Sequence, residues 1–197
     1  WEAGVPTSGP DSSHGGQRCA ATILNGNYTE GVNSRLERIA GFVVPSASQH
    51  PRLRFWHWYN INAGDYGRVD IKVGGSAWRP INSTTYNWTG SGVWTYPSID
   101  LSQYADSIVQ IGFFFHSENF QGGSVDVGPG WYIDDIAVIT GPIVFNNPEG
   151  FENGIGDWAS ERGTWEVGIP TGGPGRAYSG QKCVATVLNG NYDEAVD

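Results

Sequence analysis

The chain has 197 residues, with 20 Asp and Glu against 11 Lys and Arg, and a formal net charge of −9. Phosphates would repel so acidic a chain, which excludes nucleic acids and anionic membranes as partners. No run approaches the ~18 apolar residues of a membrane span, and the first residues do not form a signal peptide. The 29 Gly, 11 Pro and 13% aromatic residues are typical of short strands separated by many turns.

Residues 1–33 recur at the end of the chain. Aligned with residues 165–197 at a constant offset of 164, they share 19 of 33 positions. Gly16-Gln17-Arg18-Cys19, for example, returns as Gly180-Gln181-Lys182-Cys183. A period of 164 residues is too long for a solenoid unit and suits a whole domain in an array. We therefore predict one repeat over residues 1–142 that lacks its opening strand, and the opening strands of the next repeat over residues 143–197.

The two cysteines, Cys19 and Cys183, occupy equivalent positions of successive copies. They should therefore lie about one domain apart, beyond the ~7 Å between Cα atoms that a disulfide tolerates. Cys19 falls within a small apolar strand, which favours packing as a small hydrophobe. A disulfide between neighbouring chains is the alternative.

The middle of the chain is rich in strand patterns. Residues 53–59 and 68–73 are predicted to form two antiparallel strands joined through the turn-rich residues 60–67. In the second strand Val69, Ile71 and Val73 should face inward, and Arg68, Asp70 and Lys72 outward.

Further strands are predicted downstream, with Val109, Ile111, Phe113 and Phe115 on one inner face and residues 131–139 closing the unit. Residues 100–105 form the only helix candidate, a single turn capped by Asp100. Many strands at short spacing with almost no helix indicate an all-β fold, a two-sheet antiparallel β-sandwich. After residue 142, the Phe-Glu-Asn-Gly motif at 151–154 and Trp158 indicate the opening strand of a new domain.

These motifs together resemble the jelly-roll modules of the MAM, cleaved-adhesin and immune-inhibitor-A type. The resemblance covers nearly the whole repeat, and the Trp-Tyr-Ile-Asp-Asp-Ile motif at 131–136 is its most specific part. It implies a secreted or cell-surface module used in adhesion or in carbohydrate or protein binding, without catalysis of its own. The motifs that carry it are residues 151–154, Trp158, residues 165–170, 53–58, Trp94, 100–105 and 130–136.

The same resemblance implies a structural cation between the opening Glu and the closing Asp pair, here Glu152 with Asp134 and Asp135. Ca²⁺ takes 6–8 oxygen ligands at about 2.3–2.6 Å, which carboxylates on first and last strands could supply. The alternative is that Asp134 and Asp135 end a strand and accept hydrogen bonds from turn N–H groups. Glu152 belongs to the next copy, so an isolated first copy would lack its own Glu.

Two further kinds of site come from the residues. Trp56 and Trp58 share one side of a strand, and a row of rings on a sheet face suits stacking on sugar rings; core packing is the alternative. Sequons begin at Asn27, Asn82 and Asn87, candidate glycosylation sites in a glycoprotein. No His-Glu-x-x-His, Gly-x-Ser-x-Gly or phosphate-loop motif occurs, so no catalytic residues are proposed.

The sequence thus predicts a secreted, non-enzymatic tandem-repeat protein with a structural or adhesive role. Residues near 143–164 are expected to complete the sandwich of the following repeat, so that neighbouring copies join head to tail in a fibre, stalk or surface filament. A carbohydrate-binding module of a secreted enzyme or adhesin is the alternative, with glycans or a cell surface as partners.

Overall fold

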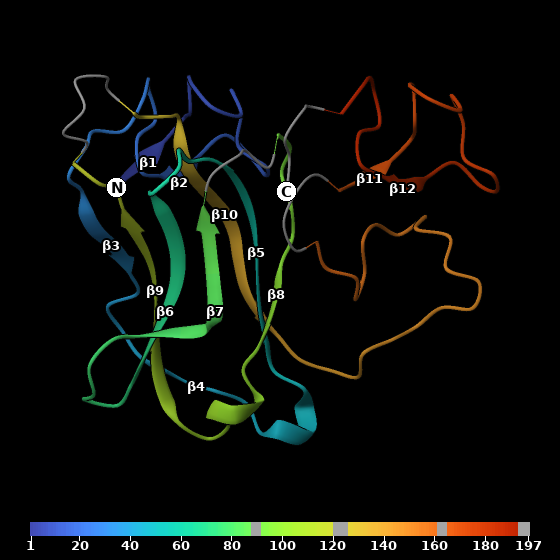
Figure 1. The fold of residues 1–197 in the computed structure, drawn as a ribbon. Helices are drawn as coiled ribbons and strands as arrows, with labels where there is room; N and C mark the ends of the chain where they lie inside the picture. Colours follow the sequence, from blue (N-terminus) through green and yellow to red (C-terminus); the bar gives the residue numbers. More distant parts are fainter. Residues whose placement is uncertain (88–91, 120–125, 161–164, 193–197) are drawn as a thin grey trace.

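Two antiparallel sheets form the body of the molecule in the computed structural model (Figure 1). Residues 1–87, 92–119, 126–160 and 165–192 are described, without the side chains of 82–87. The first sheet has the order β1 (Glu2–Gly4), β2 (Cys19–Ala21), β10 (Gly130–Ile139), β5 (Arg52–Asn60) and β8 (Ser98–Asp100). The second has the order β3 (Asn33–Glu37), β9 (Ile108–His116), β6 (Tyr66–Val73) and β7 (Arg79–Asn87), and β4 (Phe42–Val43) also pairs with β9.

The hydrophobic core lies between these two sheets, which confirms the predicted β-sandwich. All four inward residues of β9 are buried, as the alternation predicted. Val69 and Ile71 of β6 join the same core, while Val73 lies partly buried at its margin. Phe55 meets Phe113 edge to face at 5.1 Å between ring centroids, a favourable geometry for aromatic rings.

The predicted hairpin of residues 53–59 and 68–73 is wrong in its pairing. Both segments are strands, but β5 belongs to the first sheet and β6 to the second. The connection crosses from one sheet to the other, and its Ile61 is fully buried in the core. Alternation shows which face of a strand is apolar, but it does not say which strand lies beside it.

Asp70 lies on the outer face of the sheet, as predicted, but protein groups rather than solvent surround its side chain. Its side chain is fully buried, and its carboxylate pairs with Arg35 at 2.9 Å and Arg68 at 2.8 Å. Both guanidinium groups also stack on Phe114. A carboxylate can be buried on the outer face of the sheet because two cations and their hydrogen bonds replace water.

Helical structure is limited to two single turns in the described residues, η1 (Ala47–Gln49) and η2 (Ser102–Tyr104). The second is the predicted turn, and Asp100 Oδ1 accepts a hydrogen bond from Ser102 N at 2.8 Å. Hydrogen bonds from Ser102 lower the pKa of the Asp100 carboxyl. No helix of the described residues is long and apolar enough to cross a membrane.

Beyond the sandwich, residues 143–160 contain no strand, so the expected opening strand is not formed within this chain. A separate two-stranded hairpin follows, made of β11 (Glu166–Gly168) and β12 (Cys183–Ala185) (Figure 1).

Candidate binding site

Trp56 and Trp58 lie on the outer face of the first sheet, on the opposite side of β5 from the core residues Leu53, Phe55 and Tyr59. Trp58 is buried in a small second cluster with Cys19, Ala21 and Tyr132. Its ring meets Tyr132 edge to face at 5.5 Å. The two indoles therefore share one side of the strand, as predicted.

Both faces of the Trp56 indole are covered by rings of the protein. His14 stacks on it at 3.8 Å and 11°, and Tyr96 stacks at 4.7 Å and 18°. Two rings this close to one centroid would overlap if they shared a face, so they occupy opposite faces. Stacking of a sugar on Trp56 would require His14, whose side chain is partly exposed, to move aside.

A cleft of about 420 Å³ lies next to this stack, between the outer face of the sandwich and the second hairpin. His14, Trp56, Trp58 and Trp94 line one side, and Glu166 and Leu188 of the second hairpin line the other. The Trp94 indole N–H is buried and makes no hydrogen bond within the described part of the chain. The cleft is therefore lined largely by aromatic rings, and the buried indole N–H of one of them, Trp94, has no acceptor among the described residues.

The predicted acidic pair lies where β10 bends. Asp134 Oδ2 accepts a hydrogen bond from Gly15 N at 3.1 Å, and Asp135 Oδ2 contacts His14 Nδ1 at 2.8 Å. The β10–β5 register shifts between Asp134 and Ala137, and Asp135 has a positive φ of 47°, so a β-bulge forms here. The acidic pair thus fixes the first hairpin loop and holds His14 against Trp56.

Glu152 contacts the second hairpin instead. Its Oε1 accepts hydrogen bonds from Gln181 N and Lys182 N, each at 2.9 Å. These bonds lower the pKa of the Glu152 carboxyl, with Lys182 N contributing most. Among the described residues no three acidic, His or Cys side chains gather to hold a metal ion. The calcium site of Asp134, Asp135 and Glu152 is thus not assembled from these residues, and it stays a prediction.

The two hairpins have the same local structure. Glu2 pairs with Ala21, and its Oε2 accepts a hydrogen bond from Leu24 N at 2.7 Å. At the offset of 164, Glu166 pairs with Ala185 and accepts from Leu188 N, also at 2.7 Å. In both hairpins a glycine, Gly4 or Gly168, lies directly against the leucine side chain. The sequence duplication is therefore also a duplication of structure over these residues.

Their surroundings differ. Cys19 is buried, and that burial, with a smaller effect of Asp134, raises the pKa of its thiol to about 11. Cys183 is half-buried, and neither cysteine forms a disulfide. Cys19 thus packs as a small hydrophobe, as predicted.

Two arginines join residues 156–160 to the sandwich. Arg54 is fully buried on the outer side of β5, where it donates to the carbonyl oxygens of Trp158 at 2.7 Å and Gly156 at 3.3 Å. Arg52 pairs with Asp157 at 2.8 Å. We call this set of contacts, Arg52 and Arg54 with residues 156–160, the arginine clamp. Tyr96 N donates to Ser160 Oγ at 2.9 Å beside it.

The sequence analysis missed the arginine clamp, although a signal was present. Arg52 and Arg54 alternate with Leu53 and Phe55 at the start of a strand that is otherwise aromatic on both faces. Cations at outward positions of such a strand usually lie in solvent. Only the structure shows that a later segment covers them.

The sequons have different surroundings. Asn27 is exposed beside the first hairpin, where its Nδ2 contacts Val127 O at 3.3 Å. Asn82 and Asn87 belong to β7, and their side chains lie outside the described residues. Glycosylation of the three remains a prediction.

Comparison with known proteins gives a partial match. No family model matches the chain. Bacillopeptidase F of Bacillus subtilis (strain 168) is 32% identical over 146 residues, which are 70% of this chain. The match spans only 9% of that protein's length. The structure of TmCBM61 in complex with beta-1,4-galactotriose is 17% identical with a TM-score of 0.42, covering 66% of this chain and 74% of that one.

Proposed function

We propose that the chain is a non-enzymatic, extracellular structural or adhesive module of a tandem array, whose copies join head to tail in a fibre, stalk or filament. The extracellular placement rests on the resemblance to MAM-type modules and on the similarity to part of Bacillopeptidase F. That match covers a small part of a much longer protein, which suits a module that is one unit among several.

One observation carries the proposal: the second hairpin has the structure of the first, but its packing face is uncovered. Tyr28 of the first hairpin is 4% exposed, while its counterpart Tyr192 is 71% exposed. His14 stacks on Trp56, whereas its counterpart Tyr178 is fully exposed. Large rings are seldom left in water without a partner. The uncovered face therefore fits a second sandwich equivalent to residues 34–142.

The arginine clamp gives this junction a fixed direction. A buried guanidinium that loses its acceptors carries a cost of several kcal/mol, so residues 156–160 are held against the sandwich and do not swing freely. Successive modules would then keep a constant orientation, which a stalk or fibre needs and a flexible linker does not provide.

The test is the width of a distance distribution within one chain. Nitroxide labels are placed at the exposed positions Val43 and Ile169, with Cys19 and Cys183 replaced by Ala, and the distance is measured by double electron–electron resonance. We expect one narrow distribution, which the double change Asp157→Asn with Ser160→Ala should broaden. Glu37→Gln, an exposed change away from the clamp, should leave it narrow. A broad distribution in the otherwise unchanged chain would show that the modules are flexibly joined.

Glycan binding is the second candidate, favoured by the aromatic lining of the cleft and by the buried N–H of its lining residue Trp94, which has no acceptor among the described residues. A sugar hydroxyl would supply the acceptor that this donor lacks, and neutral sugars suit a cleft lined by aromatic edges.

Calorimetric titration with a panel of neutral oligosaccharides tests this candidate. Trp94→Phe keeps an aromatic ring but removes the donor, so binding should weaken by about tenfold, the worth of one hydrogen bond. Trp78→Phe, outside the cleft, should bind like the unchanged chain. If no member of the panel binds, the glycan candidate is rejected while the structural role stands.

A further inference from the structure

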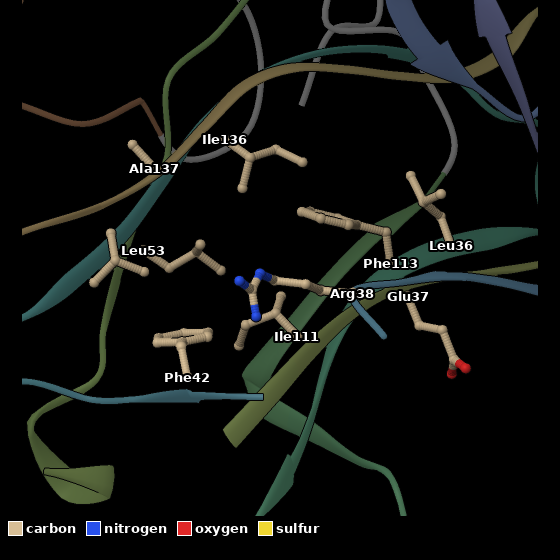
Figure 2. A pocket seen from close by; sticks show the side chains of 10 residues that line it. Leu36, Glu37, Arg38, Phe42, Leu53, Ile111, Phe113, Ile136 and Ala137 are labelled. Carbon is tan, nitrogen blue, oxygen red and sulfur yellow. The ribbon is translucent and has the colours of Figure 1, made fainter. Parts of the chain in front are cut away.

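An apolar groove of about 510 Å³ opens along one side of the sandwich (Figure 2). It lies between the edge of the second sheet, at β3 and β4, and the second half of β10 in the first sheet. Core side chains form its floor, so the groove leads directly into the space between the sheets. Among its lining residues are Leu36, Phe42, Leu53, Ile111, Phe113 and Ile136.

Ile136 and Val138 of β10 point into the space between the sheets, but both remain exposed to solvent. Val138 pairs with the core residue Leu53, and directly opposed residues of an antiparallel pair share a face, so Val138 points between the sheets. Ile136, two residues away, points the same way, and Figure 2 shows it facing the groove. Nevertheless Ile136 is 49% exposed and Val138 37%. The sandwich is therefore incomplete at this side.

The backbone at the same place has a free edge. β10 pairs with β2 only at Tyr132 and Ile133, while its pairing with β5 continues to Ile139. Within the described residues, nothing pairs with the opposite edge of β10 beyond the bulge. An unpaired edge next to an apolar groove is the surface that strand addition uses, since main-chain bonds give affinity and pockets accept alternate side chains.

We propose that the groove binds residues 143–151 of a second copy of this chain as an added strand; this rests on the proposed head-to-tail array and identifies its contact. The segment begins with Ile143, Val144 and Phe145, three residues of high strand propensity. All three are exposed, Phe145 by 69%. One molecule thus presents an apolar groove with a free edge and, at residues 143–145, an exposed apolar stretch that belongs to no sheet.

The equivalence of the two hairpins indicates where the added segment would end. Gly16 and Gly180 correspond, with φ values of 60° and 68°. A Cβ at Gly180 would collide with Glu152 Oε1, whereas a Cβ at Gly16 would meet nothing within 4 Å. The first hairpin thus has open space where the second holds Glu152. Since Gly15 N bonds to Asp134 at the bulge, that space lies at the start of the free edge of β10.

Within one chain Glu152 bonds to the second hairpin through the N–H groups of Gln181 and Lys182. In the proposed contact it exchanges these bonds for the equivalent N–H groups of Gln17 and Arg18 in a second copy. A Glu152 seated at Gln17 and Arg18 of a neighbour would place residues 143–151 along that neighbour's β10. The contact joins two different surfaces, so it continues from copy to copy unless the rotation between copies closes a ring.

Sedimentation equilibrium of two complementary variants tests the contact. Ile136→Asp places a charge in the groove, and Phe145→Asp places one in the segment; both positions are exposed, so the sandwich should still fold, which circular dichroism checks. The unchanged chain should form a concentration-dependent series of oligomers. Each variant alone should be monomeric, with association weakened by about 100-fold or more, the cost of burying an unpaired charge. Ile39→Asp, at an exposed bend whose side chain does not line the groove, should associate like the unchanged chain.

An equimolar mixture of the two variants separates this contact from general stickiness. One variant keeps a working segment and the other a working groove, so the mixture should form 1:1 dimers and nothing larger. In an array, a short linker would hold neighbouring modules at an effective concentration of about 1 mM. An unchanged chain that is still monomeric at about 1 mM would therefore overturn the proposal. So would association that survives in either variant alone. The intrachain nitroxide distance does not depend on this contact, so the array proposal stands or fails separately.

Discussion

Arg54 Nη2 donates a 2.7 Å hydrogen bond to the carbonyl oxygen of Trp158, 104 residues further along the chain. The guanidinium also lies 3.9 Å from the centroid of the Tyr96 ring. Burial lowers the pKa of Arg54, and this effect exceeds those of the neighbouring charges. Arg54 lies on the outer face of the sheet, but it is buried there and anchors the segment that leads to the second hairpin.

Replacing this anchor should lower stability measurably. Arg54→Met keeps an apolar stem but leaves the carbonyl groups of Gly156 and Trp158 without donors. Unfolding in urea should show a loss of about 1–3 kcal/mol. Arg18→Met is the matched control, since Arg18 is exposed and, among the described residues, bonds only to Ala3 O; it should change stability by less than about 0.5 kcal/mol. Equal losses in the two variants would mean that Arg54 in the arginine clamp contributes no more to stability than the exposed Arg18 does.

The assignment of faces along β9 predicts a contrast between neighbours. Phe113→Ala removes a buried ring from the inter-sheet core and should cost about 3–5 kcal/mol in denaturant titration. Phe114→Ala acts on the outer face, where the ring lies under Arg68 at 4.5 Å, and should cost clearly less. A loss below about 1 kcal/mol for Phe113→Ala would place that residue outside the core.

His57 should make stability depend on pH. Burial lowers its pKa from the ordinary 6.5 to about 3, and its Nδ1 accepts a hydrogen bond from Trp131 Nε1 at 3.2 Å. The folded state keeps the ring neutral, while the unfolded chain takes up a proton below 6.5. The contribution of His57 is therefore fully present above pH 6.5 and falls by about 1.4 kcal/mol per unit as the pH drops towards 3.

Urea unfolding at pH 7 and pH 5 checks this dependence. His57→Gln retains an acceptor for Trp131 but does not titrate, so the stability lost between the two pH values should shrink by about 2 kcal/mol. His116→Gln, a partly exposed position bonded to Asn33, should leave the loss unchanged. An unchanged pH dependence in His57→Gln would show that this ring takes up its proton equally in the folded and unfolded states.

The calcium prediction has its own test. An added segment from a neighbour would bring a second Glu152 close to Asp134 and Asp135, a fuller set of oxygen ligands than one chain offers. An ion bound only by that folded assembly would stabilise it. A chelator should then lower the melting temperature of a protein with two consecutive repeats. Identical melting curves with and without chelator, at matched ionic strength, would remove the site.

Local patterns in the sequence predicted the strands and their buried faces well. The alternation of Val109, Ile111, Phe113 and Phe115 is a property of neighbours along the chain, and so is the Asp100 cap of the single turn. These features depend on the periodicity of apolar residues and on hydrogen bonds between residues close in the sequence, and both can be recognised in the sequence itself. The repeated sequence also has a structural counterpart, since the two hairpins have the same register.

Features that depend on distant partners could not be predicted. The pairing of β5 and β6 failed because strands with similar patterns can lie in either sheet. Asp70 was expected in solvent because nothing near it in the sequence indicates that Arg35 covers it. Trp56 and Trp58 were correctly placed on one side of a strand, but only tertiary structure shows that His14 and Tyr96 cover both faces of the Trp56 ring.

The most direct test of head-to-tail completion is an isotope-filtered nuclear Overhauser experiment on the complementary mixture. The Phe145→Asp chain carries labelled Ile and Val methyl groups and an intact groove, while the unlabelled Ile136→Asp chain contributes an intact segment. We predict intermolecular contacts between the Ile136 and Val138 methyl groups and the ring protons of Phe145. A mixed dimer without these contacts, or a mixture in which no dimer forms, would contradict the account.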